Sequence, residues 1–114
     1  GIATLEQAIE MLTMFQCFAS VTEYYGFLTE GYLAAGRVAD ARRAIDAGFA
    51  TLARTGEVVW GPMLHLLRAE VTLAEDSRSR ASARLDVEDA WRIASAHGAR
   101  RAMSAAEMAL ARLS

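Results

Sequence analysis

Apolar residues recur three or four positions apart along almost the whole chain, with polar residues between them. This spacing places apolar side chains on one face of an α-helix, which has 3.6 residues per turn. No segment shows the sustained alternation of apolar and polar residues that marks a strand. The pattern therefore predicts an all-α protein of five to six helices. Their apolar series run over Leu5–Phe15, Phe18–Tyr32, Val38–Leu52, Met63–Ala74, Ala83–Ala94 and Met103–Leu113.

Short polar or glycine-containing segments separate these series and predict where the helices end. Gly36 lies in a turn, and Gly56 suits the left-handed backbone position that follows a helix. Pro62 is compatible with a helix only in its first turn, so the fourth helix is expected to begin close to it. The polar segment 76–82 reads as a loop, with Ser82 as the N-cap of the fifth helix. That helix is expected to stop at His97 and Gly98.

The chain resembles itself at a distance of about 40 positions, which is typical of a helical repeat. Glu30 corresponds to Glu70, and the segment Leu52–Gly56 corresponds to Ile93–Gly98. Each unit thus consists of a helix, a short turn, a second helix and a longer connection. Stacked helix hairpins bury a continuous core that one hairpin cannot form alone.

Residues 25–49 resemble a tetratricopeptide repeat. Counted from the turn glycine, the positions of that motif are occupied by Tyr25, Leu28, Tyr32, Gly36, Ala41 and Ile45. Thr29 and Gly48 depart from it, although both are compact. The second unit matches less well, because Arg68 and Thr72 stand where leucine and tyrosine are expected. The resemblance implies antiparallel hairpins stacked as a short α-solenoid, with Tyr25, Leu28, Tyr32, Ile45 and Phe49 in one core.

Three further segments narrow the resemblance, namely 33–37, 54–60 and 64–65. They are similar to the C-terminal helical arrays of large bacterial regulators. Those proteins join an ATP-binding module to an adenylate cyclase or to a DNA-binding transcription-regulatory domain. The resemblance implies a cytoplasmic module that binds a protein or peptide.

The first helices of stacked hairpins line a concave surface in this family. The register implies that a mixed acidic and apolar set of side chains forms that surface: Glu23, Gly26, Glu30, Leu33, Met63, Leu66, Glu70 and Leu73. Such a surface suits a peptide or a helix as partner. Two alternatives stay open, because further repeats of a parent protein would cover the same face. A binder should leave Met63, Leu66 or Leu73 exposed, whereas a spacer should bury them.

Composition gives no support for nucleic-acid or membrane binding. All twelve basic residues are arginine, and the formal net charge is −2. This balance creates no general attraction to nucleic acid or to anionic lipid. The longest uncharged run, 11–22, is shorter than the ~20 apolar residues that a membrane span needs.

Candidate chemistry is sparse, and we expect no catalytic, cofactor-binding or metal-binding residue and no enzyme activity. The two histidines, His65 and His97, and the single Cys17 are far apart in sequence and lack metal-ligand spacing. We interpret His65 and Cys17 as packing residues. His97 lies where a cation interacts well with the end of a helix.

The organisation of the chain suggests one domain over residues 1–114, excised from a larger protein. The first helix has too many apolar residues for one narrow stripe, so part of it is expected to face a missing hairpin. An isolated copy would then form a homodimer through this helix, with Met11, Met14 and Phe15 in the interface. The function predicted from the sequence is a protein-interaction or regulatory scaffold. The alternative is a structural spacer or self-association domain.

Overall fold

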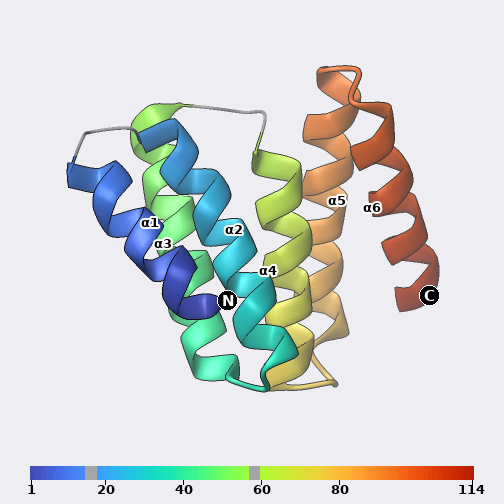
Figure 1. Ribbon diagram of the computed structural model, residues 1–114. Coiled ribbons are helices and arrows are strands. Elements are labelled where there is room, and N and C mark those ends of the chain that lie inside the picture. The colour runs from blue at the N-terminus through green and yellow to red at the C-terminus, as the bar shows by residue number, and fades with distance from the viewer. Residues whose placement is uncertain (15–17, 57–59) are drawn as a thin grey trace. The chain divides into compact units, whose positions relative to one another are not determined.

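The computed structural model describes residues 1–14, 18–56 and 60–114, and for 12–20 no side chain is described (Figure 1). Six helices occupy the described residues, and no strand occurs among them. They are α1 (Ile2–Met14), α2 (Phe18–Ala34), α3 (Val38–Thr55), α4 (Gly61–Glu75), α5 (Arg80–Ala96) and α6 (Arg100–Leu113). The prediction of an all-α protein with five to six helices is therefore confirmed.

The chain divides into two compact units, Gly1–Trp60 and Gly61–Ser114. In the first unit α1 packs on α2 and α2 packs on α3. In the second unit α4 packs on α5, α5 packs on α6, and a smaller interface joins α4 to α6. Within each unit, helices adjacent in sequence are thus adjacent in space. The prediction that residues 1–114 form a single domain stays a prediction.

The α2–α3 hairpin depends on a tight turn at Gly36. This residue has φ 74°, a left-handed conformation that glycine adopts without strain. The amide of Arg37 donates to the carbonyl of Tyr32 at 2.8 Å and closes the end of α2. Gly56 has φ 67° and donates its N–H to the carbonyl of Leu52 at the end of α3. Both predicted glycine positions are confirmed.

The core of the first unit combines aliphatic side chains with threonines. Leu28, Tyr32 and Ile45 are buried as predicted. The buried hydroxyls of Thr29 and Thr51 donate to carbonyls one turn earlier, at 2.7 and 2.9 Å. These bonds satisfy polar atoms that would otherwise destabilise the core.

Two aromatic residues of the expected core, Tyr25 and Phe49, are only half-buried. Both are covered less completely than Leu28, Tyr32 and Ile45, the other members of the predicted core.

The first helix, α1, approaches α2 closely at Gly31. A Cβ atom at Gly31 would lie 3.1 Å from Cγ1 of Ile2, so glycine makes room for this side chain. Next to Gly31, the Tyr32 hydroxyl donates at 2.7 Å to Glu6, which lies one turn after Ile2 on α1. Arg37 lies over the Tyr32 ring, 4.7 Å from its centroid. Apolar contact and a polar bond together hold α1 on α2.

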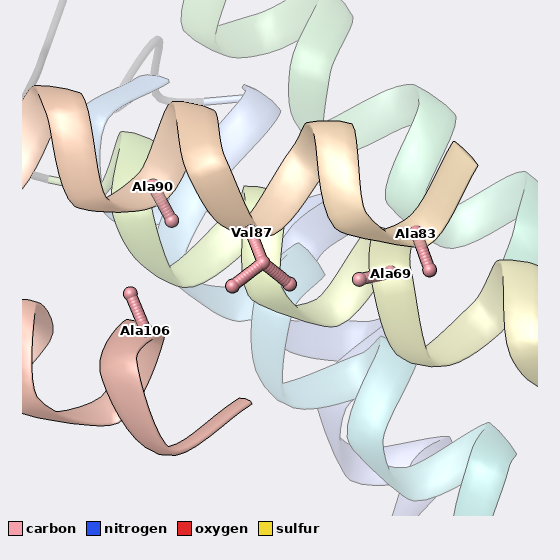
Figure 2. Packing of buried hydrophobic residues seen from close by; sticks show 5 residues of the cluster. All are labelled: Ala69, Ala83, Val87, Ala90 and Ala106. Atoms are coloured by element: carbon pink, nitrogen blue, oxygen red, sulfur yellow. The ribbon is translucent and has the colours of Figure 1, made fainter. Parts of the chain in front are cut away.

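The second unit has a core of small side chains. Ala69 of α4 packs with Ala83, Val87 and Ala90 of α5 and with Ala106 of α6. Figure 2 shows the methyl groups of Ala90 and Ala106 pointing toward each other from α5 and α6. Small residues allow helices to approach closely, and partly buried leucines complete the cluster: Leu66, Leu73, Leu110 and Leu113.

The start of α5 differs from the prediction. The helix begins at Arg80 and follows Ser79, so Ser82 is not its N-cap. The Asp76 carboxylate accepts the backbone N–H of Arg78 at 3.0 Å and closes a compact turn. This turn lets α5 begin before Ser82. The start of α4 agrees with the prediction, because that helix begins at Gly61, next to Pro62.

Two details concern the surface of α5. Trp91 lies within the predicted apolar series Ala83–Ala94, but it is 38% exposed and its Nε1–H donates to Glu107 of α6 at 3.4 Å. Glu88 pairs with Arg84 at 3.9 Å, while Arg92 pairs with Asp89 at 2.6 Å. Partners three and four positions away are equally within reach on a helix. On α3, Arg42 pairs with Asp46, four positions away, at 3.7 Å.

Candidate functional site

The predicted binding residues of the first unit all lie on α2, but they differ in accessibility. Glu30 is exposed, Glu23 and Leu33 are half-buried, and Gly26 is buried. Gly26 therefore offers no side chain and little surface to a partner. The part of this set that a partner can reach consists of Glu23, Glu30 and the edge of Leu33.

The predicted binding residues of the second unit lie on α4. Glu70 is exposed and Met63 is half-buried. Leu66 and Leu73 are partly buried and pack against the alanine cluster of α4, α5 and α6. These two leucines therefore belong to the core of the unit, and the surface available on α4 reduces to Met63 and Glu70.

The predicted self-association residues lie in and beyond α1. Met11 is 58% exposed. The Met14 side chain and Phe15 lie outside the described residues. The prediction of a homodimer through this helix thus stays a prediction.

A buried group of hydrogen-bonded polar side chains centres on Asp86 of α5. This aspartate is 8% exposed and occupies the inner face of α5 between Ala83 and Ala90. Two side chains of α4, His65 and Arg68, lie one turn apart and meet it from the opposite helix. We call these three residues the Asp86 cluster.

In the Asp86 cluster, two side chains of α4 form hydrogen bonds to the single carboxylate of Asp86. Nδ1 of His65 lies 2.8 Å from Oδ1 of Asp86. Nε of Arg68 donates to both carboxylate oxygens at 3.0 Å, and Nη2 donates to Oδ1 at 2.8 Å. An ionised carboxylate only accepts hydrogen bonds, so Nδ1 of His65 carries the hydrogen.

The environment of Asp86 acts on its pKa in two opposing ways. Burial raises the pKa, because it disfavours the charged form. The hydrogen bonds from His65 and Arg68 and the charge of the guanidinium outweigh burial and hold the pKa below 3.8. The carboxylate is therefore ionised at neutral pH and paired with the Arg68 cation.

The same region contains three side chains with metal-ligand chemistry. Ligand atoms of His65, Asp86 and Asp89 lie within 4.8 Å of one another. However, Arg68 already donates to both oxygens of Asp86. A metal ion would have to displace this guanidinium and overcome its positive charge. The arrangement is better suited to fixing α4 against α5 than to holding a cation.

The apolar pattern around His65 predicted a packing role for this residue and did not reveal its polar partner. The signal was an acidic residue at an inner position of α5, because Asp86 lies three and four positions from Ala83 and Ala90. A buried carboxylate requires a partner from a neighbouring helix. His65 and Arg68, one turn apart on α4, supply it. Of the other candidates, His97 is exposed at the end of α5, and Cys17 lies outside the described residues.

No protein-family model matches the chain, and neither does any curated protein or solved structure. No described helix has both the length and the apolar character that crossing a membrane requires. The structure itself shows an all-α protein whose six described helices pack as sequential neighbours within two units.

Proposed function

We propose that this chain is a protein-interaction module built from tetratricopeptide-like helix hairpins. It serves as a regulatory scaffold of a cytoplasmic, multidomain bacterial signalling or transcription-regulatory protein. The observation that carries the proposal is the α2–α3 hairpin. Its turn glycine has a left-handed backbone, and four of its motif positions are buried: Leu28, Tyr32, Ala41 and Ile45.

Packing in the second unit supports the same type of repeat. The α4–α5 hairpin is followed by α6, which touches both of its helices. A third helix that packs on both helices of a hairpin is what the first helix of a following repeat would do. Tetratricopeptide-like proteins mostly bind other proteins, so we infer a protein or peptide partner.

We propose a binding surface in each unit, formed by Glu23, Glu30 and Leu33 on α2 and by Met63 and Glu70 on α4. Carboxylates beside apolar side chains suit a peptide that offers both charge and hydrophobic contact. Fold alone does not define function, so the crosslinking experiment targets residues of these surfaces.

One observation favours the second candidate function, a structural spacer. Leu66 and Leu73 pack against the core of the second unit, as a spacer requires. On this alternative, α4 contributes packing and no dedicated groove.

Site-specific photocrosslinking in the cells that encode the protein distinguishes the two functions. A crosslinking amino acid at Glu30 or Met63 should capture a discrete foreign protein. The control position is Leu85 of α5, which is 64% exposed and outside the proposed surface. Capture at Glu30 or Met63 but not at Leu85 supports a binding module. Equal capture at all three positions, or no foreign adduct at any of them, contradicts it and favours a spacer.

A further inference from the structure

Charge is distributed unevenly along the chain. The first 36 residues contain four glutamates and no basic residue, whereas all twelve arginines lie at Arg37 or beyond. Helices α1 and α2 therefore carry negative charge without an internal cation. A cation that forms an ion pair with a glutamate on the exposed face of α2 therefore has to come from another part of the chain or from another molecule.

The exposed face of α2 carries a regular stripe of four residues. Glu23, Phe27, Glu30 and Ala34 are spaced by four, three and four positions, which keeps them on one side of the helix. Phe27 is 41% exposed, Glu30 and Ala34 are exposed, and Glu23 is half-buried. None of the ion pairs among the described residues involves Glu23 or Glu30. We call these four residues the acidic stripe.

The exposed face of α6 carries a stripe with the same spacing and the opposite charge. Arg101, Ala105, Met108 and Arg112 also step by four, three and four positions. All four are exposed, and Met108 is 63% exposed. The ion pairs of the described residues include neither Arg101 nor Arg112. We call these four residues the basic stripe.

We propose that the acidic stripe of one copy binds the basic stripe of a second copy. Each stripe holds one large exposed apolar side chain beside charged groups, and their charges are complementary. If the two helices align antiparallel with Phe27 opposite Met108, Glu23 lies opposite Arg112, because both pairs are four positions apart. Arg101 then lies about 6 Å along the helix from the point opposite Glu30, within reach of a long arginine side chain.

This interaction joins two different surfaces, so it is heterologous. Repetition of such a contact gives an open chain or a closed ring of copies. Exposed ion pairs are individually weak and are screened by salt. The association should therefore appear at high protein concentration and low ionic strength, and disappear at about 1 M salt, where the Debye length is ~3 Å.

The proposal goes beyond binding of a foreign protein and does not depend on it. It also differs from a homodimer through α1, because it does not use Met11. The acidic stripe shares Glu23 and Glu30 with the binding surface proposed on α2. A foreign basic helix and a second copy would therefore compete for α2.

Sedimentation velocity of the purified whole chain, with two charge-reversed variants, tests the proposal. The first variant, Glu23→Arg with Glu30→Arg, makes both stripes basic. The second, Arg101→Glu with Arg112→Glu, makes both stripes acidic. Each variant alone should remain monomeric at concentrations where the unchanged chain associates. An equimolar mixture of the two should associate again, because every basic stripe then finds an acidic one.

Two controls separate this interface from general charge and from α1. Arg78→Glu with Arg80→Glu changes the net charge as much as the second variant does, but at exposed residues before and at the start of α5. Met11→Ser removes the exposed apolar residue of α1. Both controls should associate like the unchanged chain.

Three results overturn the proposal. One is a strict monomer of the unchanged chain at every concentration in low salt. Another is association that the charge reversals or salt do not alter. The third is a mixture of the two variants that stays monomeric. Because these measurements contain no foreign protein, they leave the crosslinking test of the proposed function unaffected.

Discussion

The two hairpins α2–α3 and α4–α5 are held together by different chemistry. In the first, aliphatic and aromatic side chains meet, and the buried hydroxyls bond within their own helices. In the second, small alanines bring the helices close, and the Asp86 cluster bonds one helix to the other. The comparison shows that a repeated helical pattern does not impose one way of fixing neighbouring helices. An apolar interface tolerates shifts, whereas a buried ion pair requires one defined register.

The turns of the two hairpins also differ in what stabilises them. Gly36 needs a left-handed backbone between α2 and α3. Between α4 and α5, the Asp76 carboxylate closes the turn by accepting the N–H of Arg78. Backbone freedom in one case and a side-chain acceptor in the other achieve the same reversal of direction.

The largest expected effect comes from the two cores. Ile45→Ala in the first unit and Leu64→Ala in the second should each cost about 2–5 kcal/mol of unfolding free energy, because both side chains are fully buried. Denaturant unfolding measures this loss. Hydrogen exchange should show that each substitution weakens protection mainly in its own unit. Equal loss of protection in both units would show that residues 1–114 act as one cooperative domain.

Removing the buried carboxylate comes next in size. Asp86→Ala leaves the Arg68 cation and the His65 N–H without their acceptor and should cost about 1–3 kcal/mol. Asp46→Ala is the matched control in the first unit, because Asp46 pairs with Arg42 at the surface. That control should cost less than about 1 kcal/mol. Equal effects of the two substitutions would mean that the Asp86 cluster adds no more stability than a surface pair.

The same comparison can be made through pH. The pKa of Asp86 in the folded protein lies below its ordinary value of 3.8. Its ionised form therefore stabilises the fold above that value, and the stabilisation is lost as the pH falls through the folded pKa. Between about pH 5 and pH 2, wild type should lose more unfolding free energy than Asp86→Asn. Parallel pH curves for the two proteins would contradict the assignment.

A smaller effect is expected at the turn of the first hairpin. Gly36→Ala places a Cβ atom at φ 74° and should cost about 1 kcal/mol. Ser77→Ala, in the turn of the second hairpin, should be close to neutral because Ser77 is exposed. Thermal unfolding of both variants checks this. A neutral Gly36→Ala would show that the first turn relaxes to another conformation.

The smallest effect concerns Tyr32. Its hydrogen bond to Glu6, its burial and the Glu6 charge raise its pKa above 10.0, although Arg37 and Arg43 lower it. The neutral phenol thus adds stability at lower pH, which is lost as the pH rises through the folded pKa. Ultraviolet titration, with Tyr32→Phe to identify the signal, should show a lower pKa in Glu6→Gln. Glu10→Gln, on the same helix, should leave it unchanged.

The fold followed from sequence to a useful degree. The spacing of apolar residues predicted all six helical series, and the positions of Gly36, Gly56 and Pro62 marked real ends. The prediction of Ser82 as an N-cap was wrong, because a serine is only one of several ways to begin a helix. The spacing did not show that Trp91 is exposed, because helical spacing gives the direction of a side chain but not how far its neighbours cover it.

The candidate site was predicted less well. Leu66 and Leu73 were placed on a binding face by analogy with the repeat, yet both pack against α5 and α6 residues. The Asp86 cluster was missed, since its members lie 18 and 21 positions apart. Local periodicity carries no information about which polar residues meet across a helix pair.

The sequence by itself determined which segments are helical, where several of them end and which residues repeat after about 40 positions. These properties depend on interactions between residues a few positions apart, so a single chain pattern is enough to predict them. Only the tertiary structure decided that Asp86 meets His65 and Arg68, that Gly31 makes room for Ile2 and that Phe27 stays exposed. The physical reason is that burial and pairing depend on the side chains that a second helix brings, and this choice is made when the helices pack.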